Sequence, residues 1–440
     1  MAKKEIEHTS TTLGNQDMKS SQRMVSVVEP YELPEGWKWD LAKNLAEIYT
    51  GNSINEKVKQ EKYLGQTEGL NFIATKDIDF DGTIKYENGV KINDHEKFKI
   101  APKNTPLLCI EGGSAGRKLG FSVEDVCFGN KLCAFVCKNI NPKLLYFYLQ
   151  SNFFYHCFMK ERHGLIGGVS VNTLKQIPFP LPPTLAEQQR IVNRIESMFA
   201  KLDEAKEKAQ NVVDGFETRK AAILHKAFTG ELTAKWRKEN GVSDDSWVEK
   251  TIGECCTVVR GGSPRPAGDP KYYDGTIPFM KVADITGNDS KYVCSTQFTI
   301  KEAGLHKTRM VEPDTLLLTN SGATLGVPAI TKIKTTFNDG IAAFLNLPRE
   351  SNLYFYYFFT SKTTELRAIN MGAAQPNLNI DIIKSITISV PTLPEQQEIV
   401  RILDSVLEKE NKAKQAAESV LEQIDLLKKS ILARAFRGEL

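Results

Sequence analysis

Five short loops of the sequence combine Gly, Ser and Asn with Arg or Lys. Arg can form paired hydrogen bonds with guanine, Asn and Gln can do so with adenine, and Lys and Ser can hold phosphates. Such loops are more often plain surface turns, so they do not identify nucleic acid by themselves. The candidate DNA contacts are Ser114, Arg117, Lys118, Lys131, Arg162, Arg260, Arg265, Asn320, Ser321, Gln375 and Asn377.

The familiar motifs of catalysis and cofactor binding are absent from the sequence. The run Gly112–Lys118 reads G-G-S-A-G-R-K and fails the spacing of a phosphate-binding loop. The six histidines include no H-E-x-x-H motif and no pair at metal-ligand spacing. The Asn/Asp-Pro-Pro-aromatic tetrapeptide of amino-group DNA methyltransferases is also missing. We therefore expect no catalytic residue, no metal site and no cofactor in this chain.

The eight cysteines favour a reduced protein of the cytoplasm. None of their spacings gives a pair of C-x2-C motifs, and Cys127, Cys133 and Cys137 lie in an apolar, strand-like stretch. Cysteine in that setting usually packs in a core rather than binding zinc. Residues 1–29 are polar and lack the apolar region of a signal peptide, and runs such as Leu353–Phe359 are too short to cross a membrane.

An internal repeat organises the chain. Residues 183–232 align without a gap on residues 391–440, an offset of 208, with 22 of 50 positions identical. Upstream of each copy the similarity is weaker, but fragments match in order, such as Phe72–Ile78 with Phe279–Ile285. This pattern predicts the order globular, helix, globular, helix, with globular parts that have diverged and helices that have not.

Each repeated segment has the pattern of one long helix with a heptad seam. Prolines precede each segment, Glu187 and Glu395 fall in the first turns, and Gly230 and Gly438 mark the ends. Glu410 is the one polar residue in the seam of the second copy. The predicted coiled-coil positions are Ile191, Ile195, Met198, Leu202, Val212 and Phe216 in the first copy, and Ile399, Leu403, Val406, Val420, Ile424 and Leu427 in the second.

The first helix is too long for an ordinary domain. Ile191 to Lys226 is 36 residues, or roughly 54 Å at about 1.5 Å per residue. Such a helix acts as a spacer, and we expect the two helices to pack antiparallel with a globular domain near each end. Each seam could instead pair with a second copy of the protein, but one chain already holds both seams at high effective concentration.

These features together resemble the specificity subunit of type I restriction-modification enzymes, from about residue 30 onward. The resemblance rests on P-T-L-x-E-Q-Q-x-I-V at residues 183–192 and 391–400. It also rests on K-x-x-I-L-x-x-A-F-x-G-E-L at Lys220–Leu232 and Lys428–Leu440, and on an L-x-x-G-W-like entry at Leu33–Trp37.

The resemblance implies an α+β fold with two target recognition domains, each reading one half of a bipartite, asymmetric DNA sequence, held apart by an antiparallel coiled coil. We expect a flexible tail at 1–29, recognition domains at 30–182 and 246–390, a spacer helix and linker at 183–245 and a second spacer helix at 391–440. The implied partners are double-stranded DNA, two methyltransferase subunits and motor-nuclease subunits. S-adenosylmethionine, ATP and Mg would be bound by those partner subunits.

The charge balance is close to neutral. Lys and Arg number 57 against 54 Asp and Glu, a net charge of +3. This value argues against a uniformly basic DNA-binding surface and predicts weak DNA binding by the chain alone, with much of the phosphate contact left to partner subunits. A duplicated protein-binding scaffold without DNA readout is the alternative, and an enzyme acting alone is third.

Overall fold

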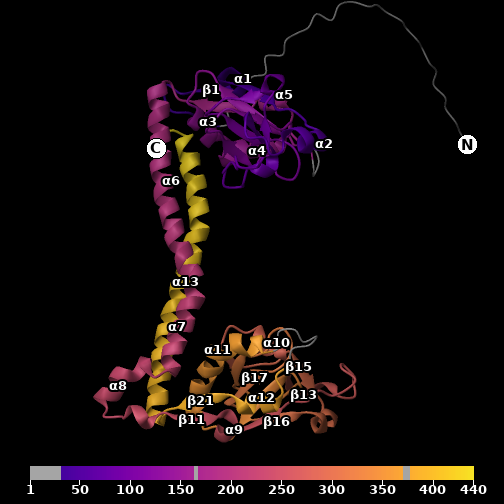
Figure 1. Ribbon diagram of the computed structural model, residues 1–440, viewed down its shortest axis with the longest axis vertical. Coiled ribbons are helices and arrows are strands. Elements are labelled where there is room, and N and C mark those ends of the chain that lie inside the picture. Colours follow the sequence, from indigo (N-terminus) through magenta and orange to yellow (C-terminus); the bar gives the residue numbers. More distant parts are fainter. Residues whose placement is uncertain (1–30, 163–166, 370–376) are drawn as a thin grey trace, which may run out of the picture. The chain divides into compact units, whose positions relative to one another are not determined.

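The computed structural model describes residues 31–162, 167–369 and 377–440. The tail predicted at 1–29 lies outside these residues. The chain divides into two compact units, Met1–Ala205 with Gln423–Leu440, and Lys206–Glu422. Each unit consists of one globular domain and one end of each long helix (Figure 1).

The first globular domain is built on two four-stranded sheets, in the orders β2-β9-β6-β7 and β4-β3-β8-β5, and a two-stranded ribbon, β1-β10. Hydrophobic residues on β6, β8 and β9 are fully buried and join the two sheets in one core. The strands are β1 Lys38–Leu41, β2 Ala46–Thr50, β3 Leu70–Ile73, β4 Lys91–Ile92, β5 Ile100–Ala101, β6 Pro106–Cys109, β7 Leu119–Phe121, β8 Val126–Phe128, β9 Leu132–Cys137 and β10 Pro178–Leu181.

The second globular domain repeats this topology. Its sheets have the orders β12-β20-β17-β18-β14 and β15-β13-β19-β16, beside the ribbon β11-β21, so β14 is an added edge strand. The strands are β11 Val248–Thr251, β12 Thr257–Arg260, β13 Tyr273–Met280, β14 Tyr292–Val293, β15 Phe298–Ile300, β16 Arg309–Val311, β17 Thr315–Thr319, β18 Pro328–Thr331, β19 Thr335–Phe337, β20 Ile341–Leu345 and β21 Thr387–Val390. The predicted duplicated α+β fold is confirmed.

Helices cover the sheets and connect each domain to the spacer. The first domain has α1 Ala42–Leu45, α2 Glu56–Val58, α3 Pro142–Leu149, α4 Asn152–Lys160 and α5 Val171–Leu174. The second has α9 Ile252–Cys255, α10 Val282–Thr286, α11 Asn352–Ala368 and α12 Ile380–Ser385, and α8 Ala234–Glu239 precedes it. Thus α11 is continuous where its counterpart is split into α3 and α4, because Ser151 caps the N-terminus of α4 through the backbone N–H of Phe154.

The long helices differ from the prediction at one point. The first copy forms α6 Leu185–Asp214 and α7 Phe216–Phe228, with a break at Gly215, whereas the second forms a single helix, α13 Leu393–Ala435. The predicted helix from Ile191 to Lys226 is therefore present with one interruption, at Gly215, where the backbone keeps a right-handed helical φ of −78° and the N–H of Gly215 still donates to Asn211. A single glycine lowers helix propensity only modestly, so the heptad pattern runs through Gly215 without revealing the break.

Within each unit the two long helices pack antiparallel. In the first unit Arg190 Nη2 donates to the carbonyl of Leu440 at 2.9 Å, and Lys428 Nζ lies 2.5 Å from Asp203 Oδ1. In the second unit the carboxylate of Glu395, at the start of α13, accepts from Arg237, which follows the end of α7. The predicted antiparallel pairing is thus present in both units.

The globular domains are attached to equivalent positions of the helices through lysines from different parts of each domain. Glu196 on α6 and Asp404 on α13 occupy equivalent positions of the repeat. Glu196 is 2.5 Å from Lys143 of the first domain, and Asp404 is 2.6 Å from Lys291 of the second. Apolar residues of the helix starts, such as Ile191 and Ile399, are buried in the cores of their domains.

The predicted seam of α13 is wrong at two positions. Val420 and Leu427 are 39% and 48% exposed, whereas Ile424 is buried as expected. The packed face includes lysines instead: Lys414 Nζ lies 4.9 Å from the ring centroid of Phe216, and Lys428 Nζ lies 5.2 Å from that of Phe199. The aliphatic stem of lysine can cover apolar surface while its ammonium stays in water, which counting apolar residues does not detect.

Candidate nucleic-acid interface

A glycine turn follows the central strand in both globular domains. In the first domain Gly112 and Gly116 bound the turn after β6, and in the second Gly322 and Gly326 bound the turn after β17. All four glycines have a positive φ between 75° and 86°. Each turn is closed by a 2.8 Å hydrogen bond, from Gly116 N–H to Cys109 and from Gly326 N–H to Thr319. The two domains therefore present the same backbone turn with different side chains.

The residue two positions before each turn is held by equivalent backbone bonds. Ile110 N–H donates to the carbonyl of Lys131 at 3.0 Å, and its own carbonyl accepts from Val169 at 3.0 Å. Asn320 N–H donates to Gly340 at 2.9 Å, and its carbonyl accepts from Leu378 at 2.7 Å. These bonds tie each glycine turn to two further loops of its domain.

A second loop is also shared, and it depends on glycine for a different reason. A Cβ at Gly51 would lie 1.9 Å from the carbonyl oxygen of Phe128, and one at Gly261 would lie 2.2 Å from that of Asn338. No side chain fits at either position, so the chain crosses the neighbouring loop in direct backbone contact. This crossing places Asn52 and Ser53 in the first domain, and Gly262 and Ser263 in the second, beside the loop that follows β8 or β19.

Two of the predicted contacts in the first domain surround an exposed aromatic ring. Arg117 Cζ and Lys118 Nζ lie 5.4 and 5.2 Å from the ring centroid of Phe80, which is 64% exposed. Arg117 donates to the carbonyl of Gly113 at 2.7 Å, and Lys118 donates to that of Thr75 at 3.1 Å. The sequence did not single out Phe80, because exposure of an aromatic residue is not visible in its type or spacing.

The other predicted contacts of the first domain are spread around the same loops. Ser114 is half-buried within the glycine turn. Lys131 is exposed, lies 3.7 Å from Glu111 and lines a pocket of about 180 Å³ together with Asn52. Arg162 donates to the carbonyls of Gly167 and Gly112, both at 3.2 Å. Its guanidinium therefore supports the glycine turn from within the domain.

In the second domain two predicted arginines meet at one carboxylate residue. Arg260 Nε donates to the carbonyl of Asp339 at 2.6 Å, and Arg265 Nη2 lies 3.4 Å from its Oδ2. Ser263 donates to Oδ1 at 2.6 Å. Burial raises the pKa of Asp339, but the Ser263 hydrogen bond and the charges of Arg265 and Arg260 outweigh it and leave the pKa below its usual value. The carboxylate stays charged and pairs with Arg265, while the backbone carbonyl of the same residue binds Arg260.

The remaining predicted residues of the second domain differ in burial and in their hydrogen bonds. Asn320 is fully buried, and neither atom of its amide has a hydrogen-bond partner within the described part of the chain. This burial contradicts the prediction that Asn320 contacts DNA, because its position in the turn points the side chain inward. Ser321 and the exposed Asn377 form an isolated β-bridge. Gln375 lies outside the described residues.

A second basic and aromatic pair was missed by the sequence analysis. Lys281 Nζ lies 3.2 Å from the ring centroid of Phe298, which is 40% exposed. Lys281 precedes α10 and Phe298 begins β15, so they are 17 positions apart in sequence and only the sheet brings them together. Each globular domain thus exposes an aromatic ring beneath a cationic side chain, an arrangement that can stack on bases and attract phosphates.

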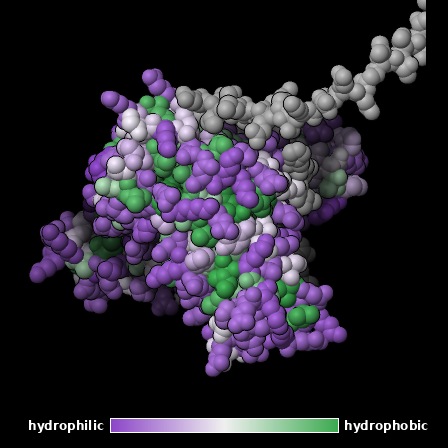
Figure 2. Space-filling view, turned by 90° about the horizontal axis from the view of Figure 1, so that it is seen from above, coloured by the Kyte–Doolittle hydropathy of each residue, from purple (hydrophilic) through white to green (hydrophobic). Residues whose placement is uncertain are grey.

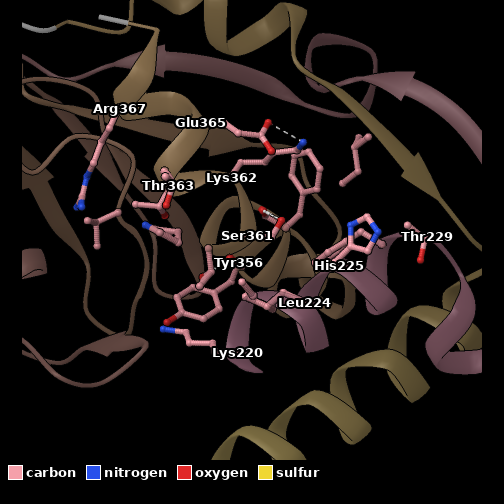
Figure 3. Close-up of a pocket in the computed structure, with 18 of the residues that line it drawn as sticks. Lys220, Leu224, His225, Thr229, Tyr356, Ser361, Lys362, Thr363, Glu365 and Arg367 are labelled. Carbon is pink, nitrogen blue, oxygen red and sulfur yellow. Dashed lines mark hydrogen bonds and ion pairs between the residues drawn. The ribbon is translucent and has the colours of Figure 1, made fainter. Parts of the chain in front are cut away.

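A pocket of about 870 Å³ lies between α7 and α11 of the second unit (Figure 3). Lys362 and Glu365 pair with each other at 2.8 Å. Thr363 and Arg367 donate to the carbonyls of Gly326 and Leu325, at 2.8 and 3.1 Å. Thr363 and Arg367 therefore support the glycine turn, while Lys362 and Glu365 neutralise each other.

Four of the eight cysteines are buried in the domains, and Cys294 is exposed. Cys109, Cys127, Cys133 and Cys256 are buried, and burial raises the pKa of Cys133 to about 12. Among the described residues no group of three or more His, Cys, Asp or Glu side chains could hold a metal ion. No described helix is both long and apolar enough to cross a membrane. The face shown in Figure 2 is mostly hydrophilic, with hydrophobic residues in small separate patches.

Comparison with known proteins gives one consistent result. The family model for type I restriction modification DNA specificity domains matches twice, at residues 34–213 and 244–423. The StySPI specificity subunit of Salmonella potsdam is 25% identical over 93% of this chain and 90% of its own length, and the EcoKI specificity subunit of Escherichia coli K12 has the same identity and coverage. The HsdS subunit of Thermoanaerobacter tengcongensis has a TM-score of 0.64 at 19% identity, covering 94% of this chain and 99% of its own.

Proposed function

The chain belongs to the family of type I restriction modification DNA specificity domains, and from this premise we propose which of its surfaces read DNA. It is the specificity subunit of a type I restriction-modification system, and catalysis is carried out by the partner modification and restriction subunits. We propose residues 30–182 and 246–390 as its two target recognition domains. The eight free cysteines support a place in the reducing cytoplasm.

The observation that carries this proposal is the pair of equivalent glycine turns. The bond that closes each turn and the bonds of Ile110 and Asn320 recur in the two domains, whereas the side chains differ: Ser114 in one turn corresponds to Thr324 in the other, and Arg117 follows the first turn where Val327 follows the second. A shared backbone presents each loop to the same region of a DNA half-site, and different side chains then select different bases. The target is therefore bipartite and asymmetric.

In the first domain Arg117, Lys118 and Phe80 form the proposed contact surface. Arg117 is exposed, and its bond to Gly113 uses one of the five guanidinium N–H groups, so the others remain for a base or phosphate. Lys118 is half-buried and anchored to Thr75, which suits a phosphate contact. Phe80 offers a flat apolar surface for a sugar or base. Lys131 and Ser114 lie in the flanking loops.

In the second domain the proposed contacts are Arg260 and Arg265. The side chain of Arg265 is 70% exposed, while Asp339 restricts the positions it can take. Restricting an arginine before it binds lowers the entropy that is lost on contact, which favours paired hydrogen bonds to guanine. Lys281 above Phe298, with Ser321 and Asn377, extends this surface.

Reconstitution tests the proposal. The chain is combined with its modification subunits, and the DNA modified by the complex is sequenced for methylated adenines. We expect one motif with two defined half-sites separated by a fixed number of unspecified base pairs. The chain alone should bind the same duplex more weakly, since its net charge is +3. Methylation without a bipartite motif would contradict the proposal, and so would binding of the complex to proteins but not to duplex DNA.

A further inference from the structure

The break between α6 and α7 is bridged by one arginine. Arg219 Nη2 donates to the carbonyl of Val212 at 2.9 Å, on the other side of the break, and Arg219 Nε donates to Glu410 of α13 at 2.8 Å. Glu410 is the residue that interrupts the apolar pattern of α13. All these residues belong to the second unit. One guanidinium therefore joins the last turn of α6, the first turn of α7 and the opposite helix.

Gly215 makes room for this bridge. A Cβ at Gly215 would lie 2.5 Å from Arg219 Nη1 and 3.1 Å from the carbonyl oxygen of Asn211. Any other residue would displace the guanidinium from the break. The break and the bridge are thus one structural feature, in which a residue without a side chain lets Arg219 fold back along the helix.

The ion pair is partly shielded from solvent. The side chain of Arg219 is 38% exposed and that of Glu410 is 25% exposed. Phe216, three residues before Arg219, is 5% exposed, and Lys414 Nζ lies 4.9 Å from its ring centroid. Apolar seams tolerate a shift of one helix along the other, whereas a polar pair within a seam is satisfied in one register alone.

The other copy of the repeat has no such bridge. The positions equivalent to Gly215, Arg219 and Glu410 are Gln423, Leu427 and Leu202. Accordingly α13 runs unbroken through Gln423. The bridge occurs once in an otherwise duplicated spacer, so a requirement shared by the two copies, such as folding of the helices or binding of identical partner subunits, does not account for it.

We propose that Arg219 and Glu410 are positioning residues, which fix the register of α7 against α13 and thereby the number of base pairs accepted between the two half-sites. The inference rests on the proposed function, because register matters for specificity only if the helices separate two DNA-reading domains. The bridge contacts no base, so the bases read within each half-site do not depend on it.

The test measures methylation by the complex of the full chain with its modification subunits. The substrates are duplexes that carry the native half-sites with spacers of native length, or one or two base pairs shorter or longer. The wild-type complex should prefer the native spacer. Arg219→Leu and Glu410→Leu, which introduce the residues of the other copy, should reduce this preference about tenfold. The exchanged pair R219E/E410R keeps opposite charges across the two helices but cannot donate to the carbonyl of Val212, so it should restore the preference only in part.

Arg401→Leu is the matched control. Arg401 forms a similar ion pair with Glu398 at 2.7 Å, but both residues are on α13, so no second helix is involved. This variant should keep the wild-type spacer preference. If Arg219→Leu fails to fold, as judged by circular dichroism, Arg219→Lys replaces it, because lysine keeps the charge but cannot bond Val212 and Glu410 in the same geometry.

Three results would overturn the inference. Folded Arg219 and Glu410 variants could keep the wild-type spacer preference, or they could change the bases read within a half-site while the preferred spacer stays the same. Either result would leave the proposed function intact. A wild-type complex that methylates none of the duplexes would instead contradict the proposed function, and with it this inference.

Discussion

The two globular domains share a backbone and differ in side chains, while the two helix starts share side chains and differ in surroundings. The glycine turns Gly112–Gly116 and Gly322–Gly326 are held by the same bonds, yet one lies beside Arg117 and Lys118 and the other does not. The backbone topology is thus the repeated element, and the side chains on it are free to diverge. A protein that recognises an asymmetric DNA sequence requires different side chains at such positions.

The helix starts show the converse. Residues 183–192 and 391–400 are nearly identical, but Glu187 is 28% exposed and pairs with Arg190 on the same helix. Glu395 is fully buried, 2.7 Å from Arg237 Nη1 and 2.7 Å from Thr233 Oγ1. The same residue type in the same motif therefore contributes differently to stability in the two units. The contribution depends on neighbouring residues that are distant in the sequence.

The largest effect on stability is expected at Glu395, because the two copies of this glutamate differ most in burial. Glu395→Ala removes the buried one of the two carboxylates that bind Arg237, leaving only the exposed Asp244 at 2.8 Å, and should cost about 3 kcal/mol of unfolding free energy. Glu187→Ala removes an exposed pair and should cost less than about 1 kcal/mol. Denaturant unfolding followed by tryptophan fluorescence can measure both, since Trp247 lies 5.9 Å from Arg237 in the second unit and Trp37 packs against the core of the first. Equal losses in the two variants would mean that burial does not separate the two copies.

The shared backbone of the globular domains can be tested at the loop crossings. Gly51→Ala and Gly261→Ala each place a Cβ against a carbonyl oxygen, at 1.9 and 2.2 Å, and each should cost about 3 kcal/mol. Gly113→Ala is the control, because nothing lies within 4 Å of its Cβ position. Thermal unfolding of the three variants checks this. A loss in one domain without a comparable loss in the other would show that the crossings are not equivalent.

A smaller effect is expected from the side chains that differ. Arg117→Ala and Arg265→Ala should each reduce discrimination at one base position by about 1–3 kcal/mol if the arginine forms paired bonds to a base. Each variant should affect one half-site and leave the other unchanged. Competition binding of the assembled complex against single-base variants of its target provides the measurement. Unaltered preference and salt dependence in both variants would show that other loops read the DNA.

The repeat, the order of the domains and the antiparallel helices could be predicted from the sequence, because each leaves a periodic or duplicated pattern. The break at Gly215 could not, since one glycine is tolerated in a heptad pattern and the bridge from Arg219 forms only in the folded protein. The seam was misplaced at Val420 and Leu427 because lysine stems cover the packed face.

The interface was predicted in part. Arg260 and Arg265 lie together as their shared loop suggests, but Asp339, which holds them, is 74 residues beyond Arg265 and only the sheet brings it close. Asn320 was misjudged because the burial of a turn residue depends on which way the turn faces. Phe80 and Phe298 were missed because aromatic residues are usually taken as core, and their exposure is a property of the tertiary structure.

The most direct test of the central claim is an exchange of one globular domain. Residues 246–390 are replaced by the matching segment of a relative with a different target, and DNA modified by the complex is sequenced for methylated adenines. The account predicts that one half of the recognised sequence changes, while the other half stays as in the wild type. An unchanged target, or a change in both halves, would contradict the claim that each globular domain reads one half-site.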